Sequence, residues 1–385
     1  MANRSRLVIL FLAARLFTFI VTPIEFLLGY GDFVNFYNLA SLPGWPFFQY
    51  WVEFPPIFPF LSTLIYWIAG GQQHVYLYIF LIILTLADAG NLILFSRFAD
   101  KYFSSEAAGL RKLTYLVILI VLPYCWWYFD PLAVFCMMAG INLLLARKEA
   151  RAGLAFGIGF LVKLFPVIGL VAVWKTLKMR SVFRIAIIIA ALAISVIGAL
   201  WVVSPDYTRV SLLSQSGKGS WETIWALIDG NFQTGAMAPP EVRADLSSVA
   251  KNLSLNPARI PPLLTLAVFA LIGLWAISRI QIQRERQSIQ LVCFAWGMFI
   301  LWSPGFSPQW ILYLIPLILL SLPEREGFLF SIVLILICLA EWPLLLSRGM
   351  FWTLLLTVPV RFILIAGLTF RVYQLLRQPE AENLQ

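Results

Sequence analysis

The chain has 385 residues, of which 61% are apolar and 12% are charged, and its mean hydropathy is +0.86. Soluble domains are about 45–50% apolar and about 25% charged, so this composition excludes an ordinary soluble fold. The net charge of +9 does not indicate nucleic-acid binding, because the basic residues form short clusters between apolar runs. Such a distribution orients a multi-pass membrane protein with its basic connections inside.

Apolar runs recur along the whole chain. A transmembrane helix needs about 20 apolar residues, and a half-helix needs fewer. The sequence therefore predicts an all-α, polytopic protein of about twelve spans, near residues 7–28, 56–70, 75–97, 112–128, 130–146, 152–174, 182–203, 261–280, 289–303, 309–322, 327–346 and 350–373. No small-x-small cleavage site follows the first run, so we expect this run to be retained as a span.

Two polar stretches, 29–55 and 204–260, are too long to be simple connections. With the N-terminus inside, counting the spans places both stretches outside. The sequence then divides into a transmembrane module at 1–203 that carries the loop 29–55, the external loop 204–260, and a second transmembrane module at 261–385.

Charge and counting disagree for two connections. Residues 97–112 and 147–151 are external by counting, yet they are basic, which is typical of internal connections. The segments between and after them contain Pro123, Asp130 and Pro166. Half-helices that turn back on the same side would remove the conflict, because such segments are tolerated where they line a polar cavity.

The first long loop contains two acids. Asp32 comes just after the first apolar run, and Glu53 comes just before the second. A carboxylate at the mouth of a membrane cavity can act as a general base toward a hydroxyl within hydrogen-bond reach. The other interpretation of Asp32 is a solvated loop acid beside a helix end.

Asp88, Asp130 and Lys163 are ionisable residues in or beside apolar runs. Such groups are costly at membrane depth and face a cavity or a charged partner. Lys163 precedes Pro166, which breaks the helix, so its ammonium group is a candidate phosphate ligand. Alternatively, Lys163 pairs with Asp88 or Asp130 and only ties helices together. For Asp88, helix packing is the favoured interpretation.

The second long loop carries Arg209, Lys218, Glu222 and Asp229, a charged set that could together hold an anionic group or could simply be solvated. Farther on, Gln309 and Trp310 lie in a proline-broken segment that begins at Ser303. Unwound backbone of this kind lines a substrate cavity in many membrane proteins, and a plain proline-rich turn is the alternative.

The sequence lacks the residues that several other kinds of catalytic or metal site require. His74 is the only histidine and lies in the short GGQQH loop, which counting places inside, so neither a Ser–His arrangement nor a histidine-rich metal site is expected. The chain has no phosphate-binding loop of the GxxxxGK[ST] type, so nucleotide hydrolysis is not expected. The four cysteines lie in apolar runs without metal-ligand spacing. No cofactor is predicted, and a requirement for a divalent metal stays open.

Four stretches together resemble the GT-C class of membrane glycosyltransferases. The closest similarity is to the branch that uses polyprenyl-phosphate mannose (glycosyltransferase family 87), and a more distant one is to the mannosyltransferase of GPI-anchor assembly. The stretches are GDFVNFYNLA with YWVEFPPIFPFLS, LTLADAGNLILFSRF, YFDPLAVFCMMAGINLLLARKEARAGLAFGIGFLVKLFPVIGL, and SPGFSPQWILYLIP. The chain departs from that family in having one acid near the start of the first loop, where relatives often have an Asp-x-Asp-like pair.

The resemblance implies inverting transfer of a sugar, mannose by expectation, from a polyprenyl-phosphate donor to a glycolipid or glycan acceptor. Asp32 would deprotonate the acceptor, while Lys163, Arg209 and Lys218 would stabilise the departing phosphate. The further cavity residues would be Glu53, Asp88, Asp130, Glu222, Gln309 and Trp310. The resemblance also implies a plasma membrane, most naturally that of a prokaryote, with the site facing outside.

Two other functions fit the same spans. A lipid-linked sugar flippase or another transporter would also carry ionisable residues at membrane depth. Transporters often show two related halves, and the halves of this chain look dissimilar. A non-catalytic subunit of an envelope assembly would explain the buried charges by helix packing alone.

Overall fold

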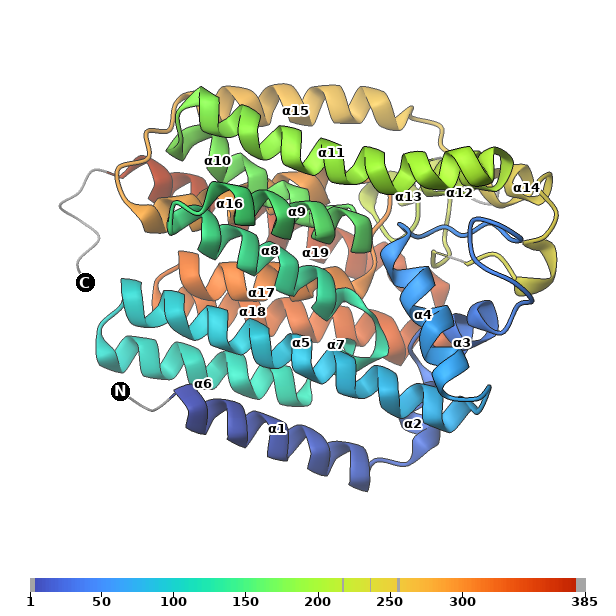
Figure 1. Ribbon diagram of the computed structural model, residues 1–385. Coiled ribbons are helices and arrows are strands. Elements are labelled where there is room, and N and C mark those ends of the chain that lie inside the picture. The colour runs from blue at the N-terminus through green and yellow to red at the C-terminus, as the bar shows by residue number, and fades with distance from the viewer. Residues whose placement is uncertain (1–3, 217, 236, 255–256, 379–385) are drawn as a thin grey trace.

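The computed structural model describes residues 4–216, 218–235, 237–254 and 257–378 (Figure 1). These residues form a mostly helical protein in which the described ranges contain no β-strand and only two isolated bridges. The predicted all-α class is confirmed.

The element order follows the chain. The α-helices are α1 (Arg4–Val21), α2 (Ile24–Gly29), α3 (Phe33–Ala40), α4 (Ile57–Ile68), α5 (Gln73–Tyr102), α6 (Ser105–Val121), α7 (Tyr124–Trp127), α8 (Asp130–Leu145), α9 (Glu149–Val162), α10 (Val171–Thr176), α11 (Met179–Val203), α12 (Pro205–Ser216), α13 (Ile224–Asp229), α14 (Ser248–Ser254), α15 (Pro262–Ser278), α16 (Glu285–Trp302), α17 (Ile311–Ser321), α18 (Glu324–Leu339) and α19 (Leu354–Arg377). The tighter or wider helical turns are η1 (Phe165–Leu170), η2 (Pro240–Val242), η3 (Pro308–Trp310), η4 (Ala340–Leu345), η5 (Leu346–Arg348) and η6 (Phe351–Thr353).

Among the described residues, four helical segments are long and apolar enough to cross a membrane. They are Gln73–Tyr102, Met179–Val203, Glu324–Arg348 and Phe351–Arg377. The longest has 30 residues, or about 45 Å of helix, which exceeds the hydrocarbon thickness of about 30 Å. These four segments are the part of the predicted multi-span arrangement that length and composition support.

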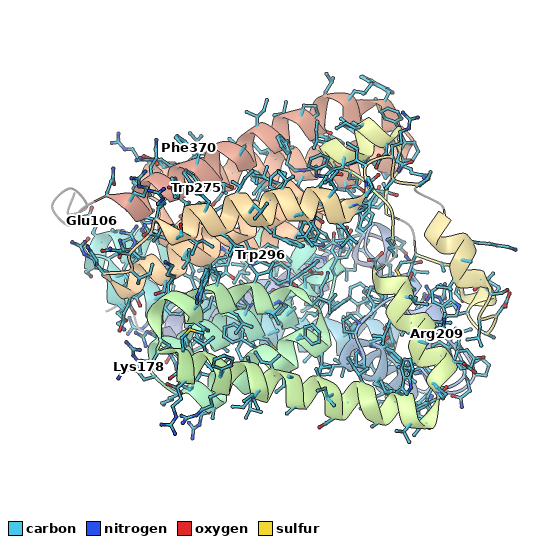
Figure 2. The ribbon with its side chains drawn as sticks, turned by 90° about the horizontal axis from the view of Figure 1, so that it is seen from above. Glu106, Lys178, Arg209, Trp275, Trp296 and Phe370 are labelled. Atoms are coloured by element: carbon cyan, nitrogen blue, oxygen red, sulfur yellow. The ribbon has the colours of Figure 1, made fainter. Side chains whose placement is uncertain are left out.

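One end of the helix bundle gathers the basic connections, and we call it the basic end. Asp100 binds both Arg4, at 3.0 Å, and Lys112, at 2.6 Å, so the start of α1 meets the α5–α6 connection there. Arg371 near the end of α19 pairs with Glu326 at the start of α18, at 2.7 Å. Figure 2 places Glu106 and Lys178 at this end, and Arg209 at the opposite one, which we call the loop end.

The structure differs from the predicted spans at α4. This helix has 12 residues, or about 18 Å, which is too short to cross a bilayer. Figure 1 shows it beside α3 at the loop end, inclined to the long helices. Because α4 does not cross, α5 starts at the loop end and runs to the basic end. The basic connection 97–112 therefore lies on the same side as α1's first residue.

The predicted single span 152–174 is a helical hairpin. α9 leaves the basic end, where Glu149 at its start pairs with Arg184 at 3.0 Å, and it stops before Lys163, whose backbone is extended. Pro166 cannot donate the hydrogen bond that would continue the helix, and η1 and α10 then return to the basic end. The hairpin brings the connection 147–151 to the basic end, as its charges indicate.

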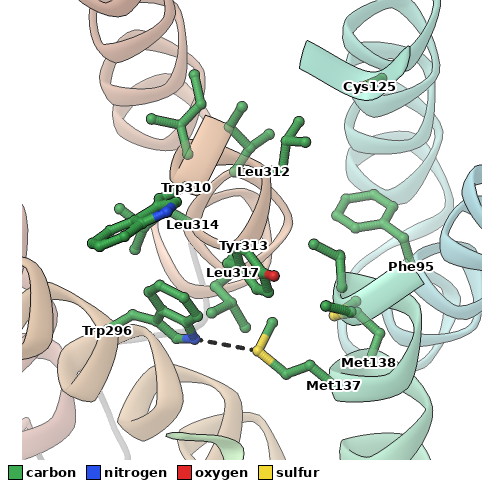
Figure 3. Packing of buried hydrophobic residues seen from close by; sticks show 14 of the residues in the cluster. Phe95, Cys125, Met137, Met138, Trp296, Trp310, Leu312, Tyr313, Leu314 and Leu317 are labelled. Atoms are coloured by element: carbon green, nitrogen blue, oxygen red, sulfur yellow. Dashed lines mark hydrogen bonds between the residues drawn. The ribbon is translucent and has the colours of Figure 1, made fainter. Parts of the chain in front are cut away.

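The core surrounds α17, all of whose residues are buried. A helix that is apolar on every face belongs in the middle of such a bundle. Figure 3 shows Trp296 of α16 stacked on Tyr313, with ring centres 4.5 Å apart, while its indole N–H donates to the Met137 sulfur at 3.2 Å. This packing fixes the α16–α17 connection, and with it Trp310, at the loop end.

Candidate functional site

A cavity of about 690 Å³ lies at the loop end, between the apex of the α9–η1 hairpin, the start of α15 and the α16–α17 connection. This volume is within the range of about 300–1,000 Å³ that is usual for small-molecule sites. Its lining includes three charged and several aromatic side chains: Glu53, Lys163, Lys218, Phe54, Phe165, Trp221, Phe299, Trp302 and Trp310.

Lys163 joins the cavity to a buried carboxylate. Its ammonium group contacts both oxygens of Asp130, at 2.7 and 2.8 Å, and lies over the ring of Phe129 at 4.9 Å. Asp130 is fully buried in the first turn of α8, where a negative charge complements the helix dipole. Both sequence-based interpretations of Lys163 therefore describe part of its position: it forms an ion pair and it lines the cavity.

Asp32 lies beside the cavity without lining it. Its backbone N–H donates to the Trp127 carbonyl at 3.1 Å, and its half-buried carboxylate accepts from the Asn35 amide at 3.3 Å. Both Lys163 and Lys218 are near enough to interact electrostatically with this carboxylate. Among the described residues Asp32 has no ion-pair partner within contact distance.

Burial raises the pKa of Asp32 from 3.8 to about 6, against the opposing effects of the Asn35 hydrogen bond and the Lys163 charge. A carboxylate with such a pKa is mostly ionised at neutral pH, and it accepts a proton more readily than an exposed aspartate does. Efficient general bases have a pKa close to the working pH. Asp32 therefore has the electrostatic character of a base.

Gly31 sets the position of Asp32, and Gly31→Ala is expected to destabilise the protein by about 1–3 kcal/mol. An added Cβ would lie 2.5 Å from the Cβ and 2.7 Å from the carbonyl oxygen of Trp127, so the loop would have to move. Thermal unfolding in detergent measures the effect. Gly29→Ala is the matched control, because a Cβ there meets nothing within 4 Å. Equal stability of the two variants would contradict the close approach.

Glu53 connects the loop 29–55 to the loop 204–260. Its carboxylate pairs with Arg243, accepts the Ala238 N–H at 3.1 Å, and lies 3.8 Å from the Lys218 ammonium. Burial alone would raise the pKa of Glu53, but the charges of Arg243 and Lys218 lower it below its ordinary value. Glu53 is thus held ionised by its partners, and its carboxylate accepts a proton less readily than that of Asp32.

Glu222 lies in a separate buried network. Burial raises its pKa to about 7, and its side chain lines a small cavity with Arg361 rather than the large one. Arg361 also pairs with Glu341 and donates to the Glu222 carbonyl oxygen. The sequence analysis did not single out Arg361 or Glu341. The rule that selected Lys163, an ionisable residue inside an apolar run, would have found both.

The remaining predicted residues are spread over the molecule. Asp88 does not line the cavity, although it is a predicted cavity residue. It forms a buried ion pair with Arg15 at 3.0 Å, which holds helices together. Arg209 is exposed on α12 and does not line the cavity either, so it does not lie with the other two predicted phosphate ligands, Lys163 and Lys218. Trp310 lines the cavity, whereas its neighbour Gln309 is half-buried outside the lining.

The described residues contain no group of three or more His, Cys, Asp or Glu side chains placed to hold a metal ion. The charged groups that they do bring together at the loop end are the Lys163–Asp130 pair, Lys218 with Glu53, and Asp32. In comparisons with known proteins, no family model and no curated protein matches the chain.

Proposed function

We propose that the protein is an inverting glycosyltransferase, which moves a sugar from a polyprenyl-phosphate donor to a hydroxyl group of a glycan or glycolipid acceptor. One observation carries the proposal. Two lysines line a cavity at the loop end, and a half-buried carboxylate of raised pKa lies within their electrostatic reach. A general base beside a site for an anionic leaving group is what a single displacement at an anomeric carbon requires.

In this mechanism Asp32 takes the proton of the acceptor hydroxyl as its oxygen attacks the anomeric carbon. The bond between that carbon and the donor phosphate oxygen breaks, and the lipid phosphate leaves with the electron pair. Lys163 and Lys218 stabilise the negative charge that develops on the phosphate. Asp130 acts through Lys163, because it holds the ammonium group at the cavity wall.

The cavity also suits a donor that arrives from the bilayer. Leu263 of α15 lines the cavity and is nevertheless 78% exposed, so the cavity wall is continuous with the apolar outer surface. A polyprenyl chain can stay in lipid while its phosphate reaches the lysines. The aromatic side chains of the lining offer flat apolar faces for a sugar ring.

We further propose a GT-C-like arrangement of crossings in the plasma membrane of a prokaryote, with the loop end outside. The crossing segments would be α1, α5, α6, α8, α9, η1 with α10, α11, α15, α16, η3 with α17, α18 and α19. This arrangement keeps about twelve crossings, replaces α4 by the second arm of the hairpin, and puts every basic connection inside.

The test is transfer of radiolabelled mannose from a polyprenyl-phosphate donor by purified protein in liposomes, with lipid extract of the host as acceptor. Wild type is expected to transfer sugar. Lys218→Gln is expected to raise the KM for the donor about tenfold, because a charge-assisted contact with phosphate is lost. Arg209→Gln removes the same charge from the exposed face of α12 and is expected to leave the KM unchanged.

Absence of transfer from mannose, glucose and arabinose donors alike would overturn the proposal. Movement of intact donor across the bilayer under those conditions would favour the flippase. An equal rise in KM for both variants would show that the charge of the loop end, and not the cavity, attracts the donor.

A further inference from the structure

A second cavity, of about 160 Å³, lies at the basic end, far from the proposed catalytic groups. The end of α8, the end of α10 and the start of α16 enclose it. Its volume is much larger than the space of about 10–15 Å³ that one water molecule needs. Its basic lining residues are Arg147, Lys175 and Arg284. Apolar residues, among them Leu145 and Leu177, also line it.

Ser288 supplies a polar group that points to a ligand. It lines the cavity and is fully buried, and its hydroxyl oxygen has no hydrogen-bond partner among the described residues. Leaving a buried hydroxyl unpaired costs about 1–3 kcal/mol. Ser288 also lies near the start of α16, where the helix dipole favours an anion. An acceptor oxygen bound in the cavity would remove the cost.

Arg147 has a backbone conformation that favours glycine, with φ of 60°. A side chain in the left-handed region costs about 1–2 kcal/mol, so glycine would suit this turn better than arginine. The arginine side chain lines the cavity, where its charge also interacts with Glu285.

The charge of the cavity stays positive. Among the described residues that line the cavity, Glu285 is the acidic one. The Glu285 carboxylate pairs with Lys101 and accepts a hydrogen bond from the Tyr102 hydroxyl at 3.1 Å. Lys175 donates to the Ile280 carbonyl at 3.2 Å, which uses one of its three ammonium protons.

We infer that this cavity binds the phosphate group of an anionic membrane lipid. Basic pockets between helices at the inner surface of a membrane favour such headgroups. The arginines and the lysine face the phosphate oxygens, Ser288 donates its hydroxyl proton, and Leu145 and Leu177 contact the glycerol and the first methylenes. This lipid site is independent of the proposed sugar transfer, and its binding test needs no catalytic activity.

The experiment is native mass spectrometry of the full chain in detergent, titrated with dioleoylphosphatidylglycerol, dioleoylphosphatidylcholine or inorganic phosphate. We expect saturable binding of phosphatidylglycerol alone. Arg147→Gly is expected to weaken it about tenfold, since a contact between charged groups is lost, while the lipid-free protein unfolds at the same or a higher temperature. Ser288→Ala is expected to weaken it as well and to stabilise the lipid-free protein.

Arg180→Gln is the matched control, because it removes one charge from an exposed position at the same end without touching the cavity. It is expected to leave binding within about twofold of wild type, since a distant charge is screened. Equal weakening by Arg147→Gly and Arg180→Gln would overturn the inference in favour of general attraction to the basic end. Equal binding of phosphatidylcholine, or tight binding of inorganic phosphate, would also overturn it.

Discussion

Replacing Asp32 by asparagine is expected to reduce sugar transfer by about 10²–10⁴-fold, the usual contribution of a general base. Asparagine has nearly the same shape as aspartate, so α3 and the contact with Trp127 should persist. The folded protein also gains from the change at neutral pH. Because the folded-state pKa of Asp32 is raised, ionisation of this carboxylate weakens the fold above its unfolded pKa of 3.8, increasingly so up to about pH 6.

The measurement therefore has two parts. Initial rates in liposomes report the loss of the base, and thermal unfolding reports a stability equal to or above that of wild type. Transfer at the wild-type rate by Asp32→Asn would reject Asp32 as the base. Loss of transfer together with clear loss of stability would assign Asp32 a structural role instead.

The pH dependence of wild-type transfer is expected to follow the same group. The rate should rise as pH increases through about 6, where Asp32 loses its proton and becomes a competent base. Asn35 lowers the pKa of Asp32 by its hydrogen bond, and its own side chain is exposed. Asn35→Ala should therefore shift the midpoint to higher pH with little effect on folding. A midpoint that stays in place would separate the pH dependence from Asp32.

Hydropathy and the distribution of basic residues differ in how well they locate the segments of the fold. Hydropathy identifies apolar runs but not their direction, and it predicts a single crossing for each of 56–70 and 152–174. The first is the short helix α4 at the loop end, and the second is a hairpin whose apex is Lys163. The basic charges of 97–112 and 147–151 predict that both connections lie on the same side, and both lie at the basic end of the structure.

The sequence predicts only part of the candidate site, because it shows which charged residues need a partner but not how the helices and loops bring them together. Lys163 and Asp130 stand out in sequence because a charge in an apolar run needs a partner. The packing of α8 against α9 determines which carboxylate pairs with Lys163, and the hydrophobic periodicity of the sequence does not predict that packing. Arg209 and Lys218 look equivalent in sequence, yet one is exposed on α12 and the other lines the cavity. Only the path of the long loop distinguishes them.

Lys163→Met is expected to lower the free energy of unfolding by about 3–5 kcal/mol and to abolish transfer. The loss of stability follows because Asp130 would stay fully buried without its cation, and removing one partner of a buried ion pair leaves an uncompensated charge. The loss of transfer has a second cause, since the lipid phosphate would leave without the positive charge that Lys163 supplies. Thermal unfolding and transfer rates of one preparation measure the two effects together.

The double variant Lys163→Met, Asp130→Asn separates these causes. It removes both charges, so most of the stability should return, while transfer should stay absent because the cation is still missing. The Arg15–Asp88 pair is the matched control, since it is also buried, with Arg15 more completely covered than Lys163, and lies away from the cavity. Arg15→Met alone should destabilise, and Arg15→Met with Asp88→Asn should recover both stability and transfer. Recovery of transfer by the Lys163→Met, Asp130→Asn variant would show that Lys163 matters only for folding and has no role toward the phosphate. Loss of transfer by both double variants would show that the loss is not specific to the cation at the cavity.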